Sequence, residues 1–115
     1  MSKIEKDMLR GHLDGLVLSI LEKDSGHGYD ILKRLREESQ DTLQLKEGSL
    51  YPALYRLEEA ALVKARWDES NAAKSKGPRR RVYSITPKGE KMLGRQREKW
   101  THFSQIIGRI MEAPS

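Results

Sequence analysis

The chain of 115 residues contains no cysteine, so disulfide bonds, thiolate zinc sites and cysteine nucleophiles are excluded. No uninterrupted apolar run approaches the roughly 20 residues that a membrane-spanning helix needs. The N-terminal stretch MSKIEKDMLRGHLDG has no apolar signal core. We therefore expect a soluble cytoplasmic protein in a reducing compartment, with no membrane partner.

The chain is also poor in the residue groupings that carry catalysis or metal binding. His12, His27 and His102 stand at no metal-ligand spacing to one another or to a carboxylate cluster. Ser49 has no candidate base at an informative position, and no glycine-rich phosphate loop is present. We therefore expect neither an enzyme nor a bound cofactor or metal.

Charge, in contrast, is abundant and unevenly placed. Charged residues make up 34% of the chain, which has a net charge of +5. Residues 74–99 alone hold ten basic and two acidic side chains, a local excess of eight positive charges. Such a concentration indicates a polyanionic partner, although an ordinary solvated surface would account for the charge equally well.

Hydrophobic periodicity predicts four helices and one two-stranded hairpin. The helices are expected at about 5–23, from the 24–28 turn to about 39, from 47 to before 63, and from 87 to about 111, with strands at 63–67 and 81–85. Val63, Ala65 and Trp67 are expected to face inward. Thr86 and Pro87 mark the last helix start, because a hydroxyl caps a helix and proline suits its first position.

This order of elements defines a mainly α fold with a small β-hairpin (α+β), namely a winged helix-turn-helix with a long C-terminal dimerisation helix. The winged helix-turn-helix is expected over residues 1–86, with its wing at about 62–85. The dimerisation helix is expected over 87–115, packed with the first helix as part of one compact unit. We expect double-stranded DNA as the partner.

The third predicted helix is the candidate for entry into the major groove. Its inward stripe is leucine, while small outward residues near its start would let the backbone approach DNA. Its candidate DNA-binding residues are Ser49, Tyr51, Pro52 and Arg56. The alternative is a plain surface face with half-buried tyrosines. If the helix begins as early as Glu47, Pro52 loses one backbone bond, to the Gly48 carbonyl.

The loop between the two strands supplies candidate phosphate contacts. These are Lys74, Lys76, Arg79 and Arg80, in a stretch without any acidic residue. The alternative is a solvated hairpin tip. Arg81 is either part of this set or a strand residue that holds the hairpin.

The last helix carries more apolar surface than so small a core can bury, so we expect a two-fold homodimer. Its candidate dimerisation residues are Leu93, Trp100, Phe103, Ile107 and Ile110. Trp100 is then either an aromatic anchor near the symmetry axis or a platform for a ligand. The first helix is expected to have a second face that allows close approach of another helix or a ligand, formed by Met8, Gly11, Gly15, Leu18 and Glu22.

Four motifs give the chain a resemblance to a known family: HGYDILKRL, GSLYPALYRLEEAALV, GPRRRVYSITPKG and KWTHFSQII. From Met8 to Ile110 it resembles the PadR-like transcriptional regulators, in particular the short subfamily with one C-terminal helix. The resemblance implies a homodimeric DNA-binding repressor of palindromic promoter sites. Many members are released from DNA by small ligands, so it also implies a small planar or phenolic effector. By the same match, a pore at the dimer centre would be lined by Met8, Gly11, Asp14, Gly15 and Trp100.

Two departures from the family pattern fall at the ends of the third helix. Lys46 stands where the cap of the third helix is often serine or asparagine. Ala61 stands where glycine usually ends that helix in a left-handed conformation, so we expect strain there or a different ending. Two other functions stay open at this point, a winged helix that binds only proteins and one that binds RNA.

Overall fold

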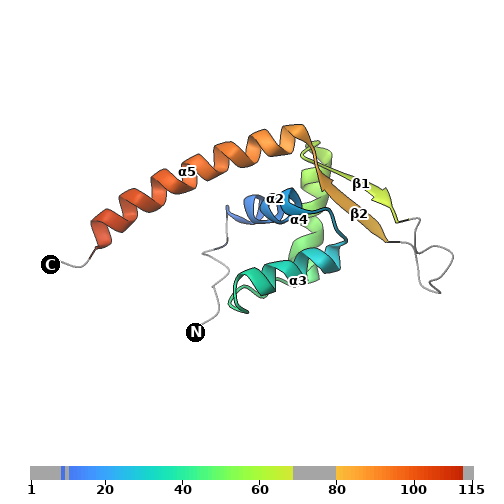
Figure 1. The fold of residues 1–115 in the computed structure, drawn as a ribbon, viewed down its shortest axis with the longest axis horizontal. Helices are drawn as coiled ribbons and strands as arrows, with labels where there is room; N and C mark the ends of the chain where they lie inside the picture. Colours follow the sequence, from blue (N-terminus) through green and yellow to red (C-terminus); the bar gives the residue numbers. More distant parts are fainter. Residues whose placement is uncertain (1–8, 10, 69–79, 113–115) are drawn as a thin grey trace.

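The computed structural model describes residues 9, 11–68 and 80–112. Its elements are α2 (Leu13–Lys23), α3 (Gly28–Glu38), α4 (Glu47–Glu59), β1 (Val63–Trp67), β2 (Arg81–Ile85) and α5 (Pro87–Met111). Figure 1 shows α2, α3 and α4 gathered in a small bundle, with the hairpin on one side and α5 passing over the bundle. The mainly α fold with one hairpin is as predicted.

One apolar core joins the three short helices to the hairpin and to the start of α5. Leu18 of α2, Ile31 of α3 and Leu54 of α4 are fully buried within it. Complete burial of such a side chain contributes about 1.5–3 kcal/mol. Helices as short as α2 and α3, with 11 residues each, are marginal alone and are held by this packing.

Two apolar residues with other expected roles lie in this same core. Leu18 was placed on a second face of the first helix, open to another helix or a ligand, and it has no exposed surface. Leu93 was assigned to the dimer interface, yet it is only 1% exposed within the single chain. The assignment of Leu93 is wrong, because periodicity identifies an apolar stripe but not the surface that covers it.

The first predicted helix is interrupted near its middle. Gly11 has a φ of +85° and lies in a turn in which the His12 amide donates to the Leu9 carbonyl (2.9 Å). α2 therefore begins only at Leu13. The prediction of one helix from residue 5 to 23 is wrong at Gly11 and His12, because glycine readily adopts the left-handed conformation that ends a helix. Gly11 and Gly15 consequently do not share a helical face.

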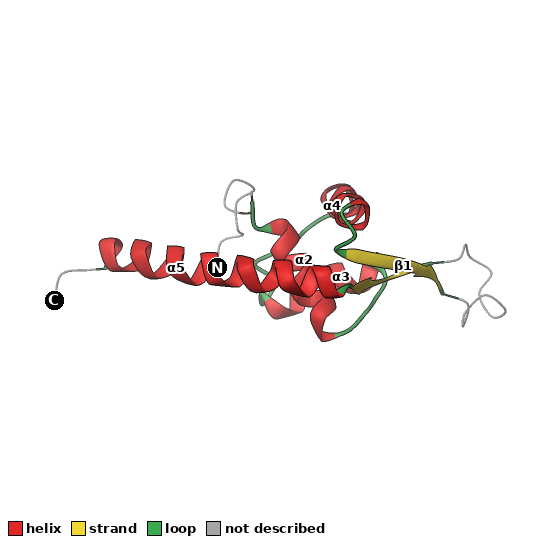
Figure 2. Cartoon of the chain, turned by 90° about the horizontal axis from the view of Figure 1, so that it is seen from above, coloured by secondary structure: helices red, strands yellow, loops and turns green. Residues whose placement is uncertain are grey.

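The hairpin is antiparallel, with Val63 opposite Ile85 and Trp67 opposite Arg81. Gly26 adds a third segment beside β2 through two backbone hydrogen bonds with Tyr83, of 3.1 and 2.9 Å. Val63 is buried as predicted, but Trp67 is 51% exposed. The inward alternation fails there because the far end of the hairpin extends beyond the helices, away from the free end of α5 (Figure 2).

α4 ends at the strained position that the sequence predicted. Ala61 has a φ of +61°, which costs a residue with a side chain roughly 1–2 kcal/mol. The Ala61 amide donates to the Glu58 carbonyl (3.0 Å), and the Leu62 amide donates to the Leu57 carbonyl (2.9 Å). These two bonds form a Schellman ending, which normally has glycine at the left-handed position.

α5 begins immediately beside that ending. The Thr86 hydroxyl accepts a hydrogen bond from the Gly89 amide (3.0 Å), and Pro87 occupies the first turn, which confirms the predicted start. The same hydroxyl donates to the Ala61 carbonyl (2.7 Å). A Cβ atom on Gly89 would lie only 2.1 Å from the Leu62 carbonyl oxygen, so only glycine allows this approach. The end of α4 and the start of α5 are therefore fixed to each other.

Candidate nucleic-acid interface

α4 presents one buried and one exposed face, as a recognition helix requires. Leu50, Ala53, Leu54 and Leu57 are buried against the other helices. The predicted DNA-binding residues Ser49, Tyr51, Pro52 and Arg56 are all exposed. Tyr55 also lies on the surface, with 63% of its area exposed, and was not among the predicted contacts.

The start of α4 is open and polar. Lys46 is the N-cap residue of α4, and its side chain accepts no hydrogen bond from an amide of the first turn. A Cβ atom on Gly48 would meet nothing within 4 Å, so packing within the chain does not demand glycine there. Pro52 lies inside the helix and lacks the amide that would bond to the Gly48 carbonyl. The exposed start of α4 therefore has no side chain at Gly48 and a restricted backbone at Pro52.

Tyr51 is positioned by the first residue of α3. A Cβ atom on Gly28 would lie 2.4 Å from the Tyr51 hydroxyl oxygen, so this glycine makes room for the tyrosine ring. Tyr51 nevertheless keeps 45% of its area exposed. The HGY stretch therefore positions a residue of α4 as well as forming the start of α3. This relationship was not predicted from the sequence.

A basic groove of about 440 Å³ separates α3 from the start of α4. Its cations are Lys33 and Arg36 of α3 and Lys46 at the start of α4. Tyr29 also lines it and is 65% exposed. None of these four residues was predicted as a DNA contact, although the outward placement of Lys33 and Arg36 on a helix beside α4 was a usable signal.

Arg56 is not a free cation. Its guanidinium donates to the Asp14 carboxylate of α2 at 3.2 Å, and both side chains are partly exposed. Arg56 was predicted to face DNA, and Asp14 was expected to line a dimer pore. The structure brings them together, since the last turn of α4 lies beside the first turn of α2.

The structure describes only part of the wing. Of its four predicted phosphate contacts, Lys74, Lys76 and Arg79 lie outside the described residues. Arg80 is exposed, and its carbonyl accepts from the Asp68 amide at 2.7 Å. This pair closes the base of the wing loop, so Arg80 lies where that loop returns to the hairpin.

Arg81 is a structural residue of the hairpin. Its two terminal nitrogens donate to both carboxylate oxygens of Glu58, at 3.3 and 2.7 Å. Its guanidinium carbon also lies 5.8 Å from the ring centres of Trp67 and Tyr83. The hydrogen bonds that Arg81 donates to Glu58 are the largest influence on Arg81 and raise its pKa. Of the two alternatives for Arg81, the geometry favours the one that holds the hairpin to α4.

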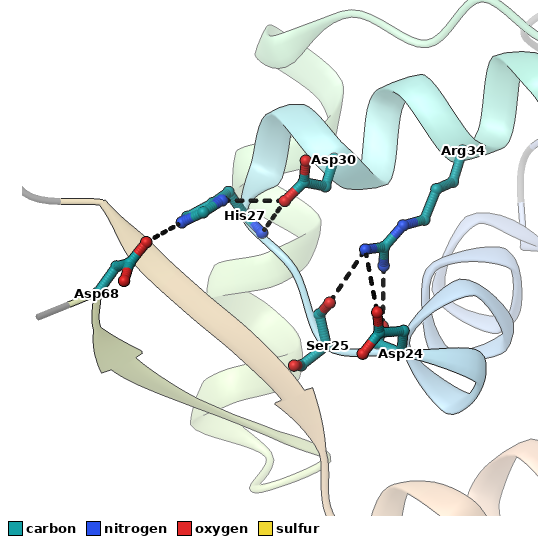
Figure 3. Close-up of polar contacts among 6 residues, drawn as sticks. All are labelled: Asp24, Ser25, His27, Asp30, Arg34 and Asp68. Atoms are coloured by element: carbon teal, nitrogen blue, oxygen red, sulfur yellow. Dashed lines mark hydrogen bonds and ion pairs between the residues drawn. The ribbon is translucent and has the colours of Figure 1, made fainter. Parts of the chain in front are cut away.

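His27 joins the start of α3 to the base of the wing (Figure 3). Its Nδ1 lies 2.9 Å from a carboxylate oxygen of Asp30, and its Nε2 lies 2.9 Å from one of Asp68. The His27 backbone amide also donates to Asp30 (3.0 Å), which caps α3. Burial raises the pKa of Asp30, but these bonds from His27 outweigh burial, so the net pKa lies below its usual value. From the sequence, no role was predicted for the His27 side chain beyond its lack of metal-ligand spacing.

The residues proposed for a dimer pore do not meet around one cavity of the single chain. Met8 lies outside the described residues, Gly11 is in a turn, and Asp14 is paired with Arg56. Gly15 faces the chain's own α5, since a Cβ atom there would lie 2.5 Å from the side-chain oxygen of Gln96. Trp100 is 53% exposed, and its ring centre lies 5.3 Å from that of His12.

The end of α5 exposes a continuous set of large apolar side chains, here called the α5 stripe. It consists of Trp100, Phe103, Ile106, Ile107, Ile110 and Met111, which are 38–77% exposed. Four of these were predicted dimerisation residues, while Ile106 and Met111 were not. Apolar exposure of this extent marks an interaction surface.

No three metal-ligating side chains come together in the described part of the chain. None of its helices combines the length and the apolarity that crossing a membrane requires.

A three-helix bundle with an exposed third helix, a basic hairpin and a capped C-terminal helix defines a winged helix-turn-helix of the DNA-binding type. The sequence profile of the transcriptional regulator PadR-like family matches residues 17–95. The chain belongs to this family, and is therefore a DNA-binding transcriptional regulator and not an enzyme.

Individual relatives support this assignment over nearly the whole chain. A transcriptional regulator from Clostridium thermocellum is 31% identical, with a TM-score of 0.83 over 95% of this chain and 99% of that one. A PadR family transcription regulator from Clostridium difficile is 35% identical, with a TM-score of 0.74 over 88% and 99%. The uncharacterized protein X of Lysinibacillus sphaericus is 34% identical over 110 residues, which are 95% of this chain and 96% of that protein.

Proposed function

We propose that this chain is a homodimeric repressor that binds a palindromic promoter site and is released by a planar aromatic or phenolic effector. The observation that carries the proposal is the α5 stripe, an exposed apolar surface toward the end of α5 that lies away from the hairpin (Figure 1).

A second copy of the chain is the partner that best fits the stripe. A two-fold axis places the same surface on both protomers, so one apolar stripe covers another. The two copies then carry their α4 helices in symmetric positions, which calls for a palindromic site with half-sites about 34–36 Å apart or a multiple of that distance. A dimer bound to a promoter occupies DNA that other proteins need, and this favours repression.

Each protomer then contacts DNA in two ways. Ser49, Tyr51 and Pro52 at the exposed tip of α4 enter the major groove, and Arg56 contacts a phosphate or a guanine edge. The wing cations Lys74, Lys76, Arg79 and Arg80 bind the sugar-phosphate backbone.

The effector is proposed to act at the aromatic residues beside the stripe. The ring centre of Trp100 lies 5.3 Å from that of His12 and 6.2 Å from that of Phe103. The exposed ring of Trp100 can stack on a planar molecule. Binding that changes the angle between protomers changes the half-site spacing, and so shifts the protein away from its DNA-bound form.

The test is the molar mass in solution, measured by light scattering, together with affinity for promoter DNA. The variant F103D places a charge in the stripe, and Q105D places the same charge on an exposed polar position of the same helix. We expect F103D to be monomeric and to bind DNA at least about tenfold more weakly, while Q105D stays dimeric. A wild type that is monomeric, or an F103D variant that is still dimeric, would contradict the proposal.

The effector is tested separately by tryptophan fluorescence. In the variant W67F, Trp100 is the remaining tryptophan, so quenching by a planar aromatic compound reports on that residue. We expect a compound that quenches to release promoter DNA as well. No quenching by any compound would favour the role of Trp100 as a dimer anchor alone, and quenching without release of DNA would contradict the proposed effector role.

A further inference from the structure

The far end of the hairpin is held to the helical body by side chains. The two hydrogen bonds between Gly26 and Tyr83 are the outermost backbone bonds between hairpin and body in the described part of the chain. Beyond them the strands continue to the Trp67–Arg81 pair and then to the bond between Asp68 and Arg80. The wing loop leaves from Asp68 and returns at Arg80, so the direction of the wing is set at this pair.

The imidazole of His27 reaches this base from the start of α3. It lies between the carboxylates of Asp30 and Asp68, 2.9 Å from each, although His27 and Asp68 are 41 positions apart in the sequence. Figure 3 shows the ring bridging from α3 to the end of β1. His27 is the N-cap residue of α3, so its backbone places the ring at the start of the helix, and Nε2 of the ring reaches the wing.

Asp68 has the most buried side chain of this group. It is the buried polar residue of the described chain, with 9% of its surface exposed. A buried carboxylate is costly unless it is hydrogen-bonded, so its contact with His27 restricts where the end of β1 can lie. The Arg81–Glu58 pair fixes the neighbouring residue of β2 to α4.

We propose that His27 and Asp68 form a latch that sets the direction of the wing relative to α3 and α4. Both are positioning residues, which act on DNA binding through the wing cations without touching DNA themselves. The part that concerns DNA rests on the wing contacts proposed above, whereas the latch itself is a property of the free protein.

Four variants separate the latch from charge and from general stability. D68A removes the contact with His27, while D68N removes the same charge but keeps an amide that bonds to Nε2 in either ring tautomer. D30A and D30N make the matched changes at the carboxylate on the opposite side of the ring, which caps α3 and does not touch the wing.

The first measurement is the backbone ¹⁵N order parameter of Trp67 and Arg80 in each variant without DNA. In the wild type and in D68N we expect rigid values of about 0.85, and in D68A a fall toward about 0.6. The two Asp30 variants should keep rigid values at both residues even where they unfold at lower temperature. Equal order parameters in D68A and D68N would overturn the latch.

The second measurement is affinity for promoter DNA with and without the additional change R80A. In the wild type and in D68N we expect R80A to weaken binding about fivefold, as loss of a phosphate contact does. In D68A the same change should cost less than about twofold, because a wing without a fixed direction no longer presents Arg80 to the backbone. An equal cost in D68A and D68N would overturn the effect of the latch on DNA binding.

The two measurements fail in different ways. If R80A has no effect in the wild type, the proposed wing contact is wrong, and the order parameters still decide the latch. If the order parameters of D68A match those of D68N, the latch is wrong, and the effect of R80A in the wild type still decides the wing contact.

Discussion

Arg56 of α4 and Asp14 of α2 form an exposed ion pair, with the guanidinium nitrogen 3.2 Å from the carboxylate oxygen. The pair links the candidate recognition helix, α4, to α2. An exposed pair of this kind contributes no more than about 1 kcal/mol. Because the free energy of this ion pair is small, a DNA phosphate that reaches Arg56 can replace Asp14 as its partner.

The variant D14N is expected to bind promoter DNA about two- to fivefold more tightly than the wild type, because it frees Arg56 for phosphate. E22Q is the matched control, since Glu22 also lies on α2, is also paired with an arginine (Arg97, 2.8 Å), and loses the same charge. Affinity measured by fluorescence anisotropy over a range of salt concentrations checks both. Equal gains in D14N and E22Q would show a general charge effect without a role for Arg56.

Ala61 offers a prediction about folding stability. Glycine at this left-handed position removes the strain of the side chain but adds freedom to the unfolded chain, so A61G should stabilise by about 0.5–1 kcal/mol. The neighbouring Ala60 has a φ of −81°, where glycine brings no relief, so A60G should destabilise by about 0.5–1 kcal/mol. Urea unfolding at one fixed protein concentration compares the two. A61G no more stable than the wild type would contradict strain at this helix end.

The parts of the fold that could be predicted are those coded by adjacent residues. Thr86 and Pro87 specify the start of α5, and the stripe of Leu50, Leu54 and Leu57 specifies α4, because caps and periodicity act within a few residues. Local chemistry is enough for both of these. The strain at Ala61 was expected from the family resemblance, since glycine usually stands at that position.

The parts that were missed depend on residues that meet only after folding. Asp68 and His27 lie 41 positions apart, and Arg56 and Asp14 lie 42 apart, so no local pattern reveals either pair. Gly11 could equally have continued a helix or ended it. Its left-handed conformation is a choice between two backbone states that glycine adopts at similar cost.

Asp30 predicts how stability depends on pH. Burial acts to raise its pKa, but hydrogen bonds from the His27 amide and ring outweigh burial, so the folded-state pKa lies below the usual value of 3.8. A carboxylate with a lowered folded-state pKa stabilises the fold above its unfolded-state pKa, and this stabilisation disappears as the pH falls through the folded-state pKa. The wild type should therefore be more stable than D30N at pH 5–6, and the difference should shrink below about pH 4.

Urea unfolding of wild type and D30N between about pH 3 and pH 6 measures that difference. Protein concentration has to be the same throughout, because association with a second copy would add to apparent stability. A difference that stays constant over this range, or that widens toward low pH, would contradict the role of ionised Asp30.

Leu93 and Phe103 lie on the same helix and should behave in opposite ways. Leu93 is 1% exposed in the core of the single chain, whereas Phe103 is 54% exposed in the α5 stripe. L93A should cost about 2–5 kcal/mol of unfolding free energy and leave the dissociation constant of the folded dimer unchanged. F103A should raise that dissociation constant about tenfold or more and have little effect on the core. Urea unfolding and sedimentation equilibrium separate the two quantities. If L93A weakened the dimer as much as F103A does, burial within the single chain would not determine which residues of α5 meet a partner.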